Sequence, residues 1–331
     1  MMNVQTMRHL VDVVEAGQMP AVAREAARLW AGEPGVASLA YVRASANFIF
    51  RFTREDQPCY LRLADASERD RAAIEAELDF IRHVGAAGVT IADPLPSTRG
   101  ALLEELTSGG RRYCAVVFRG LPGREVELDE LDEATLSEWG RTLAQLHNAS
   151  NSFLAHRARP TWEDNAHAVL ATVPPTETAV RGIIASGLEW LATQPRQDSG
   201  LIHGDFELDN LAWDGARVGV MDFDDAAYAW YAIDIAIAVQ DIWREGGPRR
   251  DAWLDAFYAG YASARPVPTG MREAVPHLQT LLLAVKFARL LRAYANTNAE
   301  NSPPWVVEMR GWHQTWLAER RAQLETLERG A

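Results

Sequence analysis

The feature that most constrains the fold of this 331-residue chain is a cluster of polar side chains inside an apolar stretch. The cluster consists of HGDFELDN at 203–210 and DFDD at 222–225. Between them, two short apolar runs are joined through Asp214-Gly215, a pair that favours a tight hairpin. Carboxylates cost free energy when they are buried without partners, so we expect the cluster to line a cleft.

The spacing within this cluster suits phosphoryl transfer. That reaction needs an attacking oxygen held in line, a carboxylate to receive its proton, and metal ions to offset charge on the phosphates. Asp205 precedes Asn210 by the interval that separates the base aspartate from the metal-binding asparagine in the protein-kinase catalytic loop. Asp222, delivered by the hairpin, offers an oxygen ligand suited to Mg²⁺. The cluster therefore predicts a Mg²⁺-dependent kinase centre.

Apolar periodicity predicts strands mainly before residue 120 and helices mainly after it. The first forty residues favour two short helices, and a hairpin follows in which Phe48, Phe50 and Phe52 share one face. The pattern then predicts a helix and two strands at 70–84, 101–106 and 113–118.

The segment RGLPG at 119–123 breaks this pattern, because glycine and proline interrupt both strands and helices. Later stretches with helical spacing are 136–146, 233–243, 253–261, 278–294 and 305–327. We therefore predict an α+β fold of two lobes: an N-terminal antiparallel sheet lobe over 1–120, with a helical extension over 1–40, and a larger, mainly helical lobe over 121–331.

Composition narrows the function classes. The formal net charge is −12, which disfavours nucleic acid and anionic membranes as partners. The two cysteines, Cys59 and Cys114, lack paired or metal-type spacing, so a reducing cytoplasm fits best. The most apolar segment is interrupted by Lys286 and Arg289, which argues against a membrane span.

The motifs HGDFELDN and MDFDD resemble those of the aminoglycoside phosphotransferase and choline kinase superfamily. The helix LSEWGRTLAQLH and the strand and connector VVFRGLPG resemble other parts of that family. The resemblance implies a protein-kinase-like bilobal fold that binds the nucleotide in the N-terminal lobe and the acceptor in the C-terminal lobe. It implies Asp205 as catalytic base, Asn210 and Asp222 as Mg²⁺ ligands, and His203 as structural support of the loop.

The same resemblance assigns nucleotide contacts in the N-terminal lobe. Arg62 takes the strand position that faces the α- and β-phosphates, and its alternation with Leu61 and Leu63 supports this orientation. Glu77 is its expected ion-pair partner, and Glu75 is the competing choice.

The loop at 43–47, which contains Ser45, should cover the phosphates, although it lacks glycines that let a backbone approach them. The connector backbone, including Phe118 and Gly120, is expected to read the purine, which leaves ATP and GTP both open.

The acceptor is expected to be a hydroxyl-bearing small molecule, a metabolite or an antibiotic. Acids and aromatic rings near the cluster suit a cationic compound such as an amino sugar. The candidate acceptor residues are Glu207, Asp209, Asp224, Asp225, Tyr228, Trp230 and Asp241. Asp224 and Asp225 have capping of the next helix as a structural alternative, and the aromatics have core packing. The acids in general are also explained by the needs of a Mg²⁺ site.

Two other functions compete with an active kinase. A nucleotide-binding pseudokinase or regulatory module is favoured only by the glycine-poor loop at 43–47. A metal-dependent hydrolase built on His203 and Asp205 lacks a second histidine at ligand spacing. The intact trio of Asp205, Asn210 and Asp222 favours the kinase.

Overall fold

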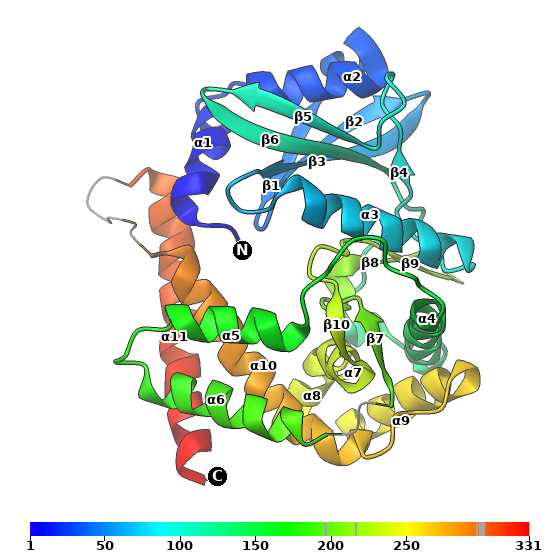
Figure 1. The fold of residues 1–331 in the computed structure, drawn as a ribbon, viewed down its shortest axis with the longest axis vertical. Helices are drawn as coiled ribbons and strands as arrows, with labels where there is room; N and C mark the ends of the chain where they lie inside the picture. The colour runs from blue at the N-terminus through cyan, green and yellow to red at the C-terminus, as the bar shows by residue number, and fades with distance from the viewer. Residues whose placement is uncertain (195–196, 216, 296, 298–301, 331) are drawn as a thin grey trace.

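The computed structural model describes residues 1–194, 197–215, 217–295, 297 and 302–330. A sheet-containing part lies above a larger helical part, as Figure 1 shows, and the predicted α+β class is confirmed.

The N-terminal sheet is antiparallel throughout, with the order β1-β2-β3-β6-β4, and β5 also pairs with β6. Its strands are β1 Ala40–Ala44, β2 Phe48–Arg54, β3 Gln57–Asp65, β4 Pro94–Leu95, β5 Leu103–Ser108 and β6 Arg111–Arg119. The hairpin between β2 and β3 turns through Glu55 and Asp56, whose φ values of 52° and 59° are those of a two-residue type I′ turn.

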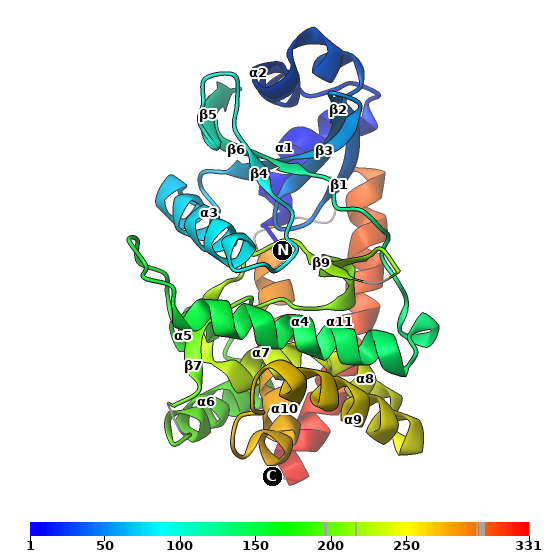
Figure 2. The ribbon, with the colours of Figure 1, turned by 90° about the vertical axis from the view of Figure 1, so that its right-hand side faces the viewer.

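The two faces of this sheet pack against different partners. The face with Phe48, Phe50 and Phe52 is buried under α2 (Ala21–Ala37), and α1 (Val4–Glu15) belongs to the same apolar cluster. The opposite face meets α3 (Arg71–Ala86), as Figure 2 shows. The expectation that Phe48, Phe50 and Phe52 share a face is confirmed.

The C-terminal part is built around α4 (Glu133–Asn151) and α9 (Gly247–Ala264), which lie side by side in Figure 2. Glycines allow their close approach: a Cβ on Gly140 would lie 2.0 Å from the carbonyl oxygen of Phe257. The remaining helices are α5 Trp162–Thr172, α6 Thr178–Ala192, α7 Tyr231–Ala238, α8 Gln240–Glu245, α10 Met271–Ala293 and α11 Pro304–Gly330, with short 3₁₀ turns at Leu128–Glu130 and Leu208–Asn210.

Two small antiparallel ribbons lie in the helical part and carry the polar cluster. They pair β7 (Ser199–Ile202) with β10 (Ala227–Trp230), and β8 (Leu211–Trp213) with β9 (Val218–Val220). The second ribbon confirms the hairpin expected around Asp214-Gly215. Helix α10 is long and apolar enough, by length and composition, to cross a membrane, but here it packs against α5, α6, α7 and α11.

The apolar core is divided by the sheet. Side chains of α3 join the core of the helical part, whereas α1, α2 and the outer sheet face form a second cluster. Trp305 of α11 packs on this second cluster and donates a hydrogen bond to Asp12 of α1 at 2.9 Å. A boundary at residues 120–121, just after β6, stays a prediction.

Candidate active site

The loop after β7 is held by a buried network around His203. Its backbone N–H and that of Gly204 donate to the two carboxylate oxygens of Asp234, at 2.8 and 2.9 Å. The ring Nε2 lies 3.0 Å from the carbonyl oxygen of Met221, and Nδ1 accepts from the backbone N–H of Asp205 at 3.2 Å. This arrangement needs a neutral ring with its proton on Nε2, and burial lowers the pKa of His203 accordingly.

Asp205 and Asn210 are in direct contact. The Asn210 side-chain N–H₂ donates to both the backbone carbonyl oxygen and the carboxylate Oδ2 of Asp205, at 2.9 Å each. Burial, together with the negative charges of Glu207 and Asp225, raises the pKa of Asp205 to about 8. A carboxyl group with this pKa is suited to accept a proton near neutral pH.

Asp222 follows β9 in a left-handed conformation, with φ of 60°. Its Oδ1 is buried and has no hydrogen-bond partner among the described residues. Burial and the neighbouring Asp224 raise the pKa of Asp222 to about 7, and Arg62, at 3.9 Å, offsets this only in part. A buried carboxylate oxygen without a donor calls for a cation.

The residues present fit a Mg²⁺ site. Asn210 directs its amide nitrogen to Asp205, which leaves its oxygen as a possible ligand beside Asp222. No group of three or more His, Cys, Asp or Glu side chains with metal-site geometry occurs among the described residues. Mg²⁺ at a nucleotide site needs only one or two protein oxygens, because water and phosphates supply the rest.

Arg62 and Glu77 form a buried, bidentate ion pair across the cleft face of the sheet. The two guanidinium nitrogens of Arg62 lie 2.7 and 2.8 Å from the Glu77 carboxylate. The competing choice, Glu75, instead pairs with Arg71 and Arg157. Arg62 also lies 5.1 Å from the ring centre of Phe118.

The glycine-poor loop between β1 and β2 contacts the segment 222–225 directly. Asn47 donates from its side-chain nitrogen to Oδ2 of Asp224 at 2.9 Å. Ser45 is exposed at the tip of this loop, and its backbone N–H donates to the carbonyl oxygen of Asn47 at 3.1 Å.

The connector is less available to a purine than expected. The backbone N–H of Gly120 donates to the carbonyl oxygen of Pro58 at 2.9 Å. Phe118 pairs with Tyr60 of β3 on one side and Pro94 of β4 on the other. The expected contact of Gly120 with the purine stays a prediction, and its backbone N–H is already used within the protein.

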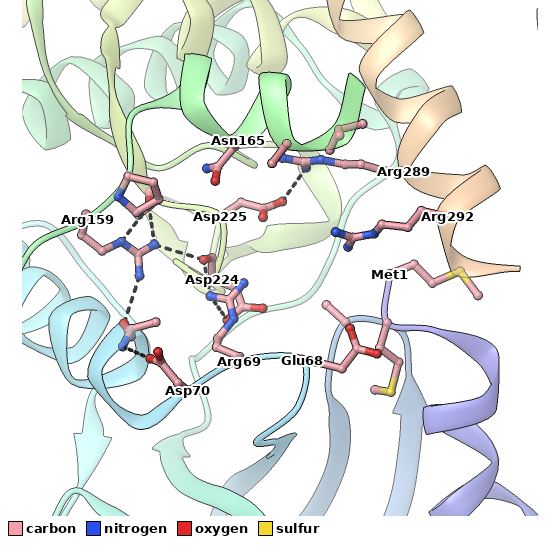
Figure 3. A pocket seen from close by; sticks show the side chains of 17 residues that line it. Met1, Glu68, Arg69, Asp70, Arg159, Asn165, Asp224, Asp225, Arg289 and Arg292 are labelled. Carbon is pink, nitrogen blue, oxygen red and sulfur yellow. Dashed lines mark hydrogen bonds and ion pairs between the residues drawn. The ribbon is translucent and has the colours of Figure 1, made fainter. Parts of the chain in front are cut away.

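The candidate acceptor residues do not form one group. Asp225 lines a cavity of about 400 Å³, drawn in Figure 3, together with Asp224. Tyr228, Trp230 and Asp241 do not line it.

Trp230 is only 3% exposed, in agreement with the core-packing alternative for the aromatics. Asp241 pairs with Arg244 of its own helix at 2.6 Å. Glu207 lies 3.4 Å from Lys286, and Asp209 is exposed.

Sequence reasoning missed the buried anchor of the loop, Asp234. It accepts hydrogen bonds from the loop backbone and lies 3.1 Å from Nε2 of His147, whose other nitrogen contacts the Tyr261 hydroxyl at 2.8 Å. The signal was present: Asp234 is a single acid in the apolar run AIDIAIA. An isolated carboxylate in a buried helix requires dedicated partners.

Two arginines, Arg69 and Arg159, were also missed. Arg69 pairs with Asp224 at 2.6 Å, and Arg159 donates to the backbone carbonyl oxygens of Ala73 in α3 and of Asp224 and Ala226. Together they connect α3 to the segment that follows Asp222. Neither has a local sequence signal, because their partners lie more than sixty residues away.

Comparison with known proteins decides the family. The profile of the phosphotransferase enzyme family matches residues 42–274, which is more than half of the chain. The chain belongs to this family. The match covers the β1–β2 loop, the Arg62–Glu77 pair and the polar cluster.

Several relatives of this chain are small-molecule kinases by name. It is 28% identical to amicoumacin kinase of Bacillus subtilis over 203 residues, which is 59% of this chain and 60% of that protein. It is 30% identical to homoserine kinase of Neisseria meningitidis over 209 residues, 61% of this chain and 66% of that protein. The chain thus matches somewhat under two thirds of the length of these curated relatives.

Solved structures extend the similarity over nearly the whole fold. An amicoumacin kinase in complex with AMP-PNP and Ca²⁺ superimposes with a TM-score of 0.79 at 20% identity and covers 92% of each chain. A microcompartment-associated aminopropanol kinase gives a TM-score of 0.69 at 23% identity, covering 92% of this chain and 96% of that one. The predicted superfamily and its bilobal fold are confirmed.

Proposed function

We propose that this phosphotransferase moves the γ-phosphate of ATP to a hydroxyl group of a small molecule, with Mg²⁺ as the divalent ion. The observation that carries the proposal is the convergence of Asp205, Asn210 and Asp222 opposite the Arg62–Glu77 pair. The kinase names of the relatives, and AMP-PNP and Ca²⁺ in one neighbouring structure, support it.

In this proposal, each side chain of the site has a separate role in the reaction. Asp205 orients the acceptor hydroxyl and receives its proton as the oxygen attacks the γ-phosphorus, and ADP leaves with the electrons of the broken P–O bond. Asn210 fixes the Asp205 carboxylate through its hydrogen bond at 2.9 Å. Bound between Asp222 and Asn210, Mg²⁺ would offset negative charge on the phosphates.

Arg62 would hold the α- and β-phosphates, and the two hydrogen bonds from its guanidinium to Glu77, which fix its orientation, support this role. The connector at Phe118 borders the expected purine position. Whether the donor is ATP or GTP is decided there by backbone groups other than the Gly120 N–H, which donates to Pro58.

Single-turnover transfer from γ-labelled ATP to a panel of hydroxylated amines, amino acids and antibiotics tests the proposal. We expect one class of acceptor to become labelled in a Mg²⁺-dependent reaction, and Asp222→Asn to abolish both the labelling and Mg²⁺-dependent AMP-PNP binding. Asp129→Asn, at an exposed position in the 3₁₀ turn Leu128–Glu130, serves as the matched control and should retain both. Metal-dependent nucleotide binding without transfer to any acceptor would instead indicate a regulatory module.

A further inference from the structure

The cavity of about 400 Å³ lies between the start of α3, α5 and α10. It begins beside the catalytic loop, because Gly204, the neighbour of Asp205, packs against the backbone of Asp225. A Cβ on Gly204 would lie 2.3 Å from the carbonyl oxygen of Asp225 and 3.3 Å from its Cβ. The cavity therefore adjoins the loop that carries Asp205, which makes it the candidate binding place for the acceptor.

Four acidic side chains line the cavity, and each already accepts a hydrogen bond or forms an ion pair. Glu68 accepts from the backbone N–H of Asn3, and Asp70 accepts from that of Ala73 at the start of α3.

Asp224 is paired with Arg69 at 2.6 Å and lies 3.5 Å from Arg62. Asp225 is paired with Arg289 of α10 at 2.9 Å, a contact visible in Figure 3. A cationic acceptor would have to displace an arginine from either carboxylate, which costs the charge-assisted hydrogen bonds of the existing pair.

Two arginines of α10 that line the cavity, in contrast, can still bind an anion. Arg289 donates to Asp225 through one nitrogen only, and its other N–H groups remain available to a ligand. Arg292, one turn further along α10, projects toward the same space in Figure 3. Within the part of the chain that the structure describes, no carboxylate lies within ion-pair distance of Arg292, which is exposed to solvent.

The rest of the lining also disfavours an organic cation. The described residues around the cavity include no aromatic side chain, so no ring can face a quaternary ammonium group. Small side chains such as Ala46, Ala73 and Ala168 border it instead. The volume is at the lower end of the usual range for small-molecule sites and suits a compact acceptor.

We infer that the acceptor carries a carboxylate in addition to its hydroxyl group, and that Arg289 and Arg292 bind this carboxylate. Guanidinium groups favour planar anions, to which they donate two parallel hydrogen bonds. The inference rests on the proposed kinase function and narrows its substrate class to hydroxy acids and hydroxylated amino acids. It replaces the cationic acceptor favoured by the sequence, because Asp224 and Asp225 already have arginine partners.

Matched acceptors that differ only in a carboxylate test this inference. Homoserine and 3-amino-1-propanol form one pair, and 4-hydroxybutanoate and 1,4-butanediol form a second pair that lacks the amine. We expect kcat/KM for the carboxylate-bearing member to be higher in at least one pair. Arg292→Gln should reduce that preference by about 10- to 100-fold, the range of a hydrogen bond to a charged group. Arg24→Gln, which removes an exposed arginine of α2, is the control and should keep the preference.

A binding measurement separates this inference from the kinase proposal. Each compound is added to the protein with Mg²⁺ and AMP-PNP, and the shift in melting temperature is recorded. An Arg292-dependent shift with carboxylates but no phosphoryl transfer would support carboxylate binding in this cavity and would count against the kinase proposal. Preference for the uncharged or purely cationic members, or no carboxylate-dependent transfer or shift, would overturn the inference and leave the kinase proposal to its own assay.

Discussion

Replacing Arg62 and replacing Glu77, the two members of a buried ion pair, should lower the stability of the protein by different amounts. Glu77 is fully buried, and among the side chains that the structure describes only Arg62 donates hydrogen bonds to its carboxylate. Arg62 has further carboxylates nearby, at 3.5 Å in Asp224 and 3.9 Å in Asp222. Removing the arginine therefore leaves a buried charge without a partner, whereas neutralising the glutamate does not.

The magnitudes follow from this difference. Arg62→Met should lower the free energy of unfolding by about 3–5 kcal/mol, the usual cost of breaking a buried pair from one side. Glu77→Gln should cost about 1–2 kcal/mol, because the amide can still accept a hydrogen bond from Arg62, whose charge keeps two carboxylate neighbours. The double variant should lose less than the sum, with a coupling of about 1–3 kcal/mol.

Urea unfolding of the four proteins near neutral pH, followed by both circular dichroism and tryptophan fluorescence, measures these differences. Repeating the unfolding measurements at lower pH provides an internal check of the role of the Glu77 charge. An unpaired Glu77 takes up a proton more readily, so the deficit of Arg62→Met should shrink as the pH falls. Equal effects of the two single substitutions, or strict additivity, would refute the reasoning.

Three further predictions concern the loop and its charges. The pKa of Asp205 is raised to about 8 and that of Asp222 to about 7, so between about pH 4 and 8 these two carboxyl groups bind more protons in the folded protein without metal than in the unfolded chain. Relative to the double variant Asp205→Asn/Asp222→Asn, in which neither site titrates, the melting temperature should therefore fall as pH rises through this window, and less so with Mg²⁺ and AMP-PNP bound. A difference between the two proteins that does not change with pH would contradict the raised values. Asp234→Asn should cost about 2–4 kcal/mol of stability and slow turnover, because the buried carboxylate accepts from the backbone of His203 and Gly204, whereas Asp255→Asn, at an exposed position of α9, should change neither. Gly204→Ala should be at least about 1 kcal/mol more destabilising than Gly215→Ala: both have positive φ, of 83° and 95°, but only Gly204 has no room for a Cβ. Equal losses for the two glycines would show that backbone conformation alone decides.

Local sequence patterns predicted much of the fold and of the catalytic loop. The alternation of Phe48, Phe50 and Phe52 identified the buried face of the sheet, and the Asp205–Asn210 spacing identified two side chains that the structure holds 2.9 Å apart. Both signals are local, because strand alternation and a five-residue interval are set by the geometry of a short segment. Helices α5 and α6, and the break between α7 and α8 at Val239, were not predicted.

The partners of the acidic side chains could not be predicted from local patterns. Asp225 and Arg289 are separated by 64 residues, and Asn47 and Asp224 by 177. Contacts of this kind depend on how whole elements pack, which periodicity does not report. The sequence therefore indicated where negative charge gathers, whereas the structure shows which of those charges already have partners.

The most direct test of the central claim is the effect of Asp205→Asn on transfer and on nucleotide binding, measured in the same preparation. Loss of the proton acceptor should lower kcat by at least about 100-fold, the lower range for general base catalysis. The dissociation constant for Mg²⁺ and AMP-PNP should stay nearly unchanged, because Asp222, Asn210 and the Arg62–Glu77 pair remain in place. Turnover by Asp205→Asn at the rate of the unaltered protein would contradict the assignment of Asp205 as the base.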